Sequence, residues 1–392
     1  MTRTVSQRVQ RVKPSPTLVA TARAAQLRAE GRDIISLTAG EPDFDTPAHV
    51  AEAAHEAIRG GFTRYTDVGG TPELKDAVIA KFATDNGLLY ERAQVLVSTG
   101  AKQTLFNLCM ALLDPGDEAL IPAPYWVSYP DMVKLADGVP VIIPAGADQG
   151  YKITARQLEA AITPRTRLLL LNSPSNPTGA AYTRAELEAL GEVLRLHPRI
   201  VVGTDDIYEK IHWAPEPFHS LAQAVPALYD RTVTINGLSK SHAMTGWRIG
   251  YCGGPREIIT AMATVQGQST SNPSSISQKA AVAALTGPQG CVAEMNASYR
   301  ARHDFFVAGL NALPGVRCLP GVGTFYAFAD VSEAMRARGD ANDMVFCDAL
   351  LEATGVAVVS GSGFGAPGHA RFSFATRPEL LHEALERMAG WL

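Results

Sequence analysis

The sequence predicts an α/β protein, with a large domain built on a mostly parallel sheet and a smaller α+β domain beside it. Apolar runs of strand length alternate with helical periodicity through the middle of the chain, which favours a parallel sheet covered by helices on both faces. The C-terminal third changes to a mixed order of helices and strands. Of the 392 residues, 46% are hydrophobic, so there is enough apolar material to offset chain entropy.

In the middle of the chain, short apolar runs predict strands at residues 94–98, 139–143, 166–171, 199–203 and 232–235. Apolar residues at three- and four-residue intervals predict helices over residues 101–113 and 184–195. This alternation of strand and helix is the order expected for a parallel sheet, because each crossover between parallel strands needs room for a helix.

The C-terminal third is expected to form helices over residues 292–313, 343–353 and from 378 onward, with strands at 324–329, 356–360 and 371–375. A helix over residues 17–29 has no predicted strand beside it, so we expect it to pack with this unit. The large domain is therefore expected to span residues 46–290. Residues 1–45 and 291–392 together are expected to form the small domain.

Composition and charge exclude several functions. With 35 basic and 39 acidic residues the net charge is −4, and no long run of one sign offers a grip on nucleic acid. The five cysteines are far apart, no CxxC occurs, and no histidine has metal-ligand spacing, so neither a disulfide scaffold nor a metal site is expected. No apolar run approaches the ~20 residues needed to span a bilayer, and the first 13 residues lack the apolar core of a secretory signal. The expected location is the cytoplasm.

Polar residues cluster where the middle strands end, which is where open α/β sheets bind ligands. Asn176-Pro177-Thr178-Gly179 follows the strand at 166–171, and Asp205 and Tyr208 follow the strand at 199–203. Ser239 and Lys240 follow the strand at 232–235, and Arg248 comes eight residues after Lys240. The glycine-rich run at 361–365 lacks the strand and helix context of a nucleotide loop, so a plain turn is expected there.

NPTG, DxxY and SKxxxxxxxR in this order and spacing resemble the fold type I pyridoxal-phosphate (PLP) enzymes, in particular the class I aminotransferases related to aspartate aminotransferase. The resemblance covers essentially the whole chain, from residues 13–15 (KPS) and 37–47 (LTAGEPDFDTP) to 371–376 (RFSFAT). It implies PLP as cofactor and ping-pong transfer of an amino group between an L-amino acid, aspartate or glutamate as the best guess, and a 2-oxo acid such as 2-oxoglutarate or oxaloacetate. It also implies a homodimer with shared active sites.

The resemblance assigns roles around the cofactor ring. Lys240 would hold PLP as an imine and shuttle the substrate's Cα proton. Asp205 would keep the ring nitrogen protonated by charge attraction, while the neighbouring Asp206 is expected to point away. Asn176 and Tyr208 would hydrogen-bond the phenolic oxygen.

The remaining cofactor contacts involve the phosphate and the ring face. Arg248 and Ser239 are implied as side-chain ligands of the phosphate, and Gly100 and Ala101 as a backbone cradle at a helix start. Tyr65 is expected to reach the phosphate of the other subunit. Either Trp126 or Tyr125 would stack on the pyridine ring, with Trp126 as the closer match to the family.

The substrate residues follow from the same resemblance. Arg371 would bind the α-carboxylate bidentately together with the backbone of Gly40, and Trp126 and Asn176 would also face the substrate. Lys102 and Ser15 mark a bacterial subgroup with a lysine after the phosphate-binding Gly-Ala. Lys102 would meet a second carboxylate, although it could instead help to hold the phosphate.

Several alternatives stay open on the sequence alone. Aromatic amino acids or prephenate are possible substrates, because a lysine discriminates less sharply than an arginine. PLP-dependent lyases share the lysine and aspartate, since a fold does not select a reaction. A ligand sensor with an added DNA-binding domain and a nicotinamide oxidoreductase are both disfavoured, the second because the glycine fingerprint is absent.

Overall fold

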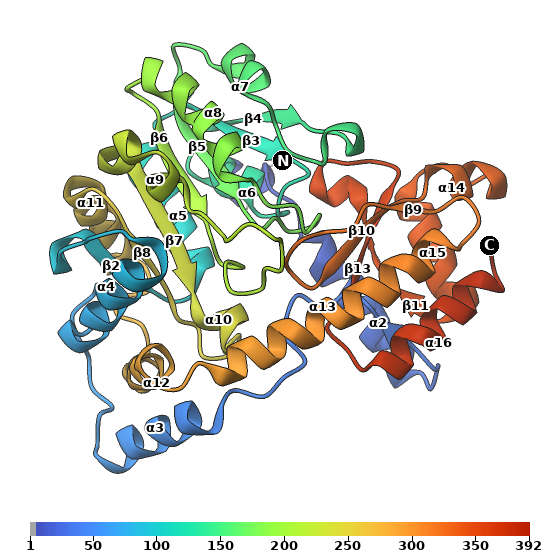
Figure 1. The fold of residues 1–392 in the computed structure, drawn as a ribbon, viewed down its shortest axis with the longest axis horizontal. Helices are drawn as coiled ribbons and strands as arrows, with labels where there is room; N and C mark the ends of the chain where they lie inside the picture. The colour runs from blue at the N-terminus through green and yellow to red at the C-terminus, as the bar shows by residue number, and fades with distance from the viewer. Residues whose placement is uncertain (1–4) are drawn as a thin grey trace.

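A seven-stranded sheet forms the centre of the larger part of the molecule (Figure 1). The computed structural model describes residues 5–392. The strand order is β2-β8-β7-β6-β5-β3-β4, and only β8 runs antiparallel to its neighbours, so the predicted mostly parallel sheet is confirmed. The strands are β2 (Val95–Ser98), β3 (Glu118–Ala123), β4 (Val139–Pro144), β5 (Thr166–Asn172), β6 (Val201–Asp205), β7 (Thr232–Gly237) and β8 (Gly250–Gly253).

Helices cover both faces of this sheet because the central strands are apolar on both sides. Alternate leucines of β5 enter two different cores: Leu168 and Leu170 pack with α5 and α11, and Leu169 and Leu171 with α7 and α8. A third core joins α3, α4, α10 and α12 to β2 and β8. The helices are α3 (Ala48–Arg59), α4 (Pro72–Asn86), α5 (Ala101–Leu112), α6 (Tyr129–Leu135), α7 (Ala155–Ala161), α8 (Arg184–Leu196), α9 (Leu221–Ala224), α10 (Leu238–Ser241), α11 (Arg256–Gly267) and α12 (Ser275–Thr286).

The second part contains two smaller sheets. One has the order β12-β13-β10-β9, and the other pairs β1 with β11 in parallel. Its strands are β1 (Ile35–Ser36), β9 (Arg317–Cys318), β10 (Tyr326–Asp330), β11 (Val356–Ala357), β12 (Val359–Ser360) and β13 (His369–Ser373). Its helices are α1 (Gln7–Gln10), α2 (Pro16–Ala29), α13 (Gly290–Asn311), α14 (Ser332–Arg338), α15 (Asp343–Thr354) and α16 (Pro378–Ala389).

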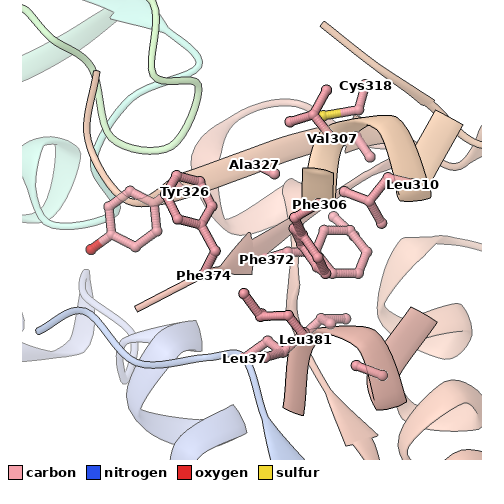
Figure 2. Packing of buried hydrophobic residues seen from close by; sticks show 14 of the residues in the cluster. Leu37, Phe306, Val307, Leu310, Cys318, Tyr326, Ala327, Phe372, Phe374 and Leu381 are labelled. Atoms are coloured by element: carbon pink, nitrogen blue, oxygen red, sulfur yellow. The ribbon is translucent and has the colours of Figure 1, made fainter. Parts of the chain in front are cut away.

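The core of the second part lies between its antiparallel sheet and the long helix α13 (Figure 2). Aromatic rings from α13, β10 and β13 fill it, including Phe306, Tyr326 and Phe372, all at most 2% exposed. The N-terminal helix α2 packs Ala24 and Leu27 against Leu351 and the β11 region, as expected from the sequence. Figure 1 shows α13 running from the vicinity of α12 into this part, so it links the two.

Some predicted elements differ from the observed ones. The apolar run at 356–360 is not one strand: β11 and β12 are separated at Val358 and belong to different sheets. The strand expected at 199–203 lies two residues later, at Val201–Asp205, which brings Asp205 into the strand itself. The glycine-rich run at 361–365 forms a short 3₁₀ turn at Gly361–Phe364. The domain boundaries at residues 46 and 290 stay a prediction.

Within residues 5–392, no helix combines the length and apolar character needed to cross a bilayer. The same part of the chain contains no group of three or more His, Cys, Asp or Glu side chains arranged to hold a metal ion.

Candidate active site

A cavity of about 490 Å³ opens at the carboxyl ends of the central strands, where they face β13, α2 and the loop after β1. Its walls contain twelve of the residues predicted from the sequence: Ser15, Gly40, Ala101, Lys102, Trp126, Asn176, Asp205, Tyr208, Ser239, Lys240, Arg248 and Arg371. These positions are spread over more than 350 residues of sequence, and the fold brings them to one place. Gly100 and Tyr65 do not line the cavity.

Lys240 lies on α10, directly after the buried strand β7. Its Nζ donates a hydrogen bond to the carbonyl oxygen of Gly40 at 2.5 Å. Burial lowers the pKa of Lys240 to about 8, because removal from water disfavours the ammonium form. A lysine with this pKa has a substantial share of nucleophilic neutral amine near neutral pH.

Asp205 ends β6 and is buried at the floor of the cavity. Its Oδ2 accepts a hydrogen bond from the Tyr129 hydroxyl at 2.6 Å, while its Oδ1 is buried without a partner. Burial raises the pKa of Asp205 to about 6, against the opposing effect of the Tyr129 hydrogen bond. The neighbouring Asp206 is buried outside the cavity lining, so Asp205 is the carboxylate of this pair that faces the cavity.

Arg371 is 1% exposed, although it carries a full positive charge. Its Nη1 donates to the Asn176 side-chain oxygen at 3.1 Å, and its Nη2 donates to the Thr38 carbonyl at 2.8 Å. The guanidinium lies 4.2 Å from the centre of the Tyr326 ring, and Nε is buried without a partner. None of these described contacts is with a carboxylate, so Arg371 is a buried cation suited to an anionic ligand.

Tyr208 lies in the turn after β6, beside the same arginine. Its hydroxyl shares a hydrogen bond of 3.1 Å with the Tyr326 hydroxyl. Burial raises the pKa of Tyr208 well above its usual range, so it stays a neutral donor. The Asn176 backbone N–H donates to Asn172 at 2.8 Å, which fixes the loop after β5 at the cavity edge.

A cradle for an anion forms where β2 leads into α5. Gly100 has φ +84°, a left-handed conformation, and a Cβ at this position would lie 2.3 Å from Nη2 of Arg248. A side chain at this position would be strained by the backbone conformation and would push the Arg248 guanidinium away from the start of α5. Backbone N–H groups at Ala101, the guanidinium and the Ser239 hydroxyl together supply donors for a phosphate.

Trp126 and Lys102 form one wall of the cavity. The Nζ of Lys102 lies 4.9 Å from the centre of a Trp126 ring, a cation–π contact. Burial, followed by repulsion from Arg248, lowers the pKa of Lys102. Tyr125 instead packs against Gly365 outside the cavity lining, so of the two candidates for stacking only Trp126 lines the cavity.

Tyr65 is separated from the other predicted residues. Its side chain is 93% exposed, in the loop between α3 and α4. Ser15 lies at the cavity mouth and precedes α2, where it makes no capping hydrogen bond through its side chain.

Several cavity residues were not identified from the sequence. They include Glu41, Thr245 and Tyr326. Tyr129 does not line the cavity but donates a hydrogen bond to Asp205. Glu41 follows a predicted site residue directly, which was an available signal. Tyr129 and Tyr326 belong to no motif in the sequence, so nothing there marked them as site residues.

The residues present fit PLP. The unpartnered oxygen of Asp205 is suited to a protonated ring nitrogen, and Arg248 with the start of α5 is suited to the phosphate. Trp126 offers an aromatic face between them, and Lys240 offers the amine.

Known proteins resemble the chain throughout. The family model "Aminotransferase class I and II" matches residues 32–388. A protein of Nitrosomonas europaea named aspartate/prephenate aminotransferase is 54% identical over 99% of both chains. Among solved structures, the aspartate aminotransferase of Rhizobium meliloti is similar with a TM-score of 0.94 and 50% identity, covering 99% of this chain and 98% of that one. The Thermus thermophilus aspartate aminotransferase with maleate has a TM-score of 0.94 and 44% identity, covering 100% of both.

Proposed function

The chain belongs to the class I and II aminotransferases, and we propose that its preferred amino donors are aspartate and glutamate, with oxaloacetate and 2-oxoglutarate as the corresponding 2-oxo acids. It is a PLP-dependent aminotransferase with the fold type I architecture, as predicted. The names of its relatives support the choice of donor, and so does the Thermus thermophilus aspartate aminotransferase, which was solved with the dicarboxylate maleate.

Within the cavity, Arg248, Ser239 and the start of α5 would hold the cofactor phosphate, and Asp205 would hold a proton at the ring nitrogen. Bound PLP supplies an electron sink that stabilises negative charge at the substrate Cα. Asn176 and Tyr208 would donate hydrogen bonds to the cofactor's phenolic oxygen. Trp126 would hold the ring by stacking.

The chain's own groups would orient the substrate and move its proton. Arg371 would bind the α-carboxylate through two parallel hydrogen bonds, which fixes the direction of the Cα–H bond. The Lys240 amine would take the proton from Cα and pass it to the cofactor, and it would carry a proton in the opposite direction in the reverse half-reaction. Its lowered pKa suits this role, because a base works best when its pKa lies near the working pH.

One observation carries the choice of dicarboxylate donors: two cations, Arg371 and Lys102, line the same cavity as Lys240. Lys102→Ala should lower kcat/KM for aspartate by roughly 10- to 150-fold, the effect of one charge-assisted hydrogen bond, and should change an aromatic donor far less. Lys134→Ala, on α6, is the matched control. A panel of donors against 2-oxoglutarate and oxaloacetate measures this, and equal losses for aspartate and phenylalanine would show that Lys102 serves the cofactor.

Prephenate is a second candidate acceptor, because the Nitrosomonas relative is named for it. Prephenate also carries two carboxylates, so it can use the same two cations. Incubation with aspartate and prephenate should then yield the amino product, measured by chromatography. Absence of that product under conditions where 2-oxoglutarate reacts would restrict the enzyme to the smaller acids.

We also propose that the enzyme is a homodimer in which Tyr65 contacts the phosphate bound to the partner. Its 93% exposure supports this, because a large aromatic side chain so far from the chain's own cavity is free to contact a second copy. Mixing Tyr65→Ala and Lys240→Ala subunits tests it. A hybrid dimer regains one intact site only if Tyr65 acts across the interface, so mixtures without recovered activity would contradict the proposal.

A reducing compartment such as the cytoplasm is proposed as its location. Cys109, Cys252, Cys291, Cys318 and Cys347 are all unpaired, and four of them are buried, which suits proteins that are not exposed to oxidants. Fractionation of the source cells would test it.

A further inference from the structure

The loop after β1 places one acidic side chain at the mouth of the cavity. Among the residues that line this cavity in the described chain, Glu41 and Asp205 carry negative charge, against Lys102, Lys240, Arg248 and Arg371. Asp205 is buried at the floor, whereas Glu41 is exposed at the mouth. Glu41 has no place among the predicted cofactor or carboxylate contacts, so its position in a cationic cavity needs its own explanation.

Glu41 is held in place by the loop that carries the phosphate-binding arginine. Its Oε2 accepts a hydrogen bond from the Thr245 hydroxyl at 2.9 Å. The carbonyl oxygen of Thr245 in turn accepts a hydrogen bond from Nη1 of Arg248 at 2.9 Å. The carboxylate is therefore fixed beside the cavity without a cationic partner, because a hydroxyl neutralises none of its charge.

The carbonyl of Gly40 already binds an ammonium group in this structure, and the carboxylate of Glu41 lies in the same cavity wall. The Gly40 oxygen accepts the hydrogen bond from Lys240 Nζ at 2.5 Å. Of the charges near Lys240, that of Glu41 acts most strongly to favour the ammonium form, ahead of Asp205. This corner of the cavity is thus built to hold a primary ammonium ion.

Lys240 leaves this corner free when its amine carries the cofactor, and the substrate then brings an ammonium of its own. We propose that the Gly40 carbonyl and the Glu41 carboxylate form the binding site for the ammonium group of the incoming amino acid. This inference rests on the proposed function, since it requires an amino acid as substrate. The amino acid would be held at both ends, with its α-carboxylate on Arg371 and its ammonium on Glu41.

The proposal separates the two kinds of substrate. An amino acid carries an ammonium at neutral pH, whereas the 2-oxo acid that it becomes does not. Glu41 should therefore favour amino acids over 2-oxo acids of the same length and carboxylate charge. If Glu41 only held the loop in place through Thr245, its loss would weaken the binding of amino acids and 2-oxo acids equally, because both need the same cavity shape.

The test uses the PLP-loaded enzyme and the variant Glu41→Gln, which keeps an oxygen to accept the Thr245 hydrogen bond but loses the charge. Single-turnover absorbance measurements follow the half-reaction with aspartate and the half-reaction with 2-oxoglutarate separately. The apparent Kd for aspartate should rise roughly 5- to 20-fold, the effect of one partly exposed charge-assisted contact. The Kd for 2-oxoglutarate should stay within about twofold or fall, because a repulsive charge is removed.

Equilibrium binding gives a second readout that does not depend on turnover. Calorimetry should show weaker binding of α-methylaspartate, which has an ammonium but no Cα–H, and unchanged or tighter binding of succinate, which has no ammonium. The effect of Glu41→Gln on α-methylaspartate binding, relative to succinate, should shrink at high salt, because Glu41 is exposed and salt screens its charge. Glu56→Gln on the neighbouring helix α3 is the matched control and should change neither ligand.

Three results would overturn the inference: equal weakening of both ligands in Glu41→Gln, no change for either, or the same selective loss in Thr245→Val, which keeps the charge of Glu41. Failure of the proposed function looks different. In that case the wild-type enzyme itself would transfer no amino group from any donor in the panel.

Discussion

The buried ion pair between Lys81 and Glu209 gives a sharp test of how the site is supported. Lys81 lies on α4, and Glu209 directly follows Tyr208 in the turn after β6. Their side chains are only 7% and 4% exposed. Asn86 joins the pair on both sides, since it accepts from Lys81 Nζ at 2.7 Å and donates to Glu209 Oε2 at 2.9 Å. The pair therefore ties the turn that carries Tyr208 to α4.

The structure predicts unequal effects for the two single substitutions. Lys81→Met leaves Glu209 buried with a neutral amide as its partner and with the buried Asp206 nearby, so it should cost about 3–5 kcal/mol of unfolding free energy. Glu209→Gln leaves Lys81 with Asn86 and with Asp85, 3.7 Å away, so about 1–3 kcal/mol is expected. The double variant should lose less unfolding free energy than the two single variants together, because neither buried charge is then left without its partner.

Equilibrium urea unfolding of the cofactor-free protein, followed by tryptophan fluorescence, measures all three variants. The more exposed pair of Lys152 and Glu186 is the matched control, and Lys152→Met, which keeps the Glu186 capping box of α8, should cost no more than about 1 kcal/mol. Additive losses in the double variant, or a loss below about 1 kcal/mol for Lys81→Met, would refute the inference that burial makes this ion pair important for stability.

Three further predictions concern the cofactor residues. The rate at which cofactor-free enzyme recombines with PLP should rise as pH increases through about 8. Only the neutral amine of Lys240 can react, and its pKa is lowered to about 8. A midpoint of the rate near the pKa of free lysine would contradict this. Asp205→Ala should lower turnover by several orders of magnitude in steady-state assays, with Asp205→Glu milder; a larger loss in Asp206→Ala would move the role to Asp206. Gly100→Ala should weaken PLP binding, measured by equilibrium dialysis, since its Cβ would meet Arg248 at 2.3 Å; unchanged affinity would show that the guanidinium is not needed at the cradle.

The elements with strong periodicity could be predicted from the sequence, and those with mixed signals could not. The helix expected over 184–195 is present, and so are five strands of the central sheet (β2, β4, β5, β6 and β7), because their apolar patterns are regular. Strand β3 was missed because Glu118 and Pro122 interrupt its apolar run, although both are accommodated in the sheet. Strand β8 contains two glycines in four residues, which masks its strand character.

For the candidate site, the residue types could be predicted from the sequence, but their neighbours in space could not. Asn176 and Arg371 are 195 residues apart, and their hydrogen bond depends on how β13 meets the loop after β5. Tyr129 reaches Asp205 across 76 residues in the same way. The unpartnered oxygen of Asp205, which favours a cation, depends on burial and is invisible in a sequence.

The two cations that we propose to face the substrate, Arg371 and Lys102, lie in different environments, which would let one cavity be strict toward one carboxylate and tolerant toward the other. Arg371 is fully buried and its charge is unscreened, so an α-carboxylate that reaches it replaces much of the hydration the arginine has lost. Lys102 is only partly covered by the cavity wall, so water and salt reach its charge and weaken its attraction, and its flexible side chain fixes no geometry. An α-carboxylate is therefore a firm requirement, whereas the distal group contributes less free energy. A cavity with this asymmetry is expected to accept several dicarboxylates of different length, so the breadth of acceptors should be set at Lys102 and not at Arg371.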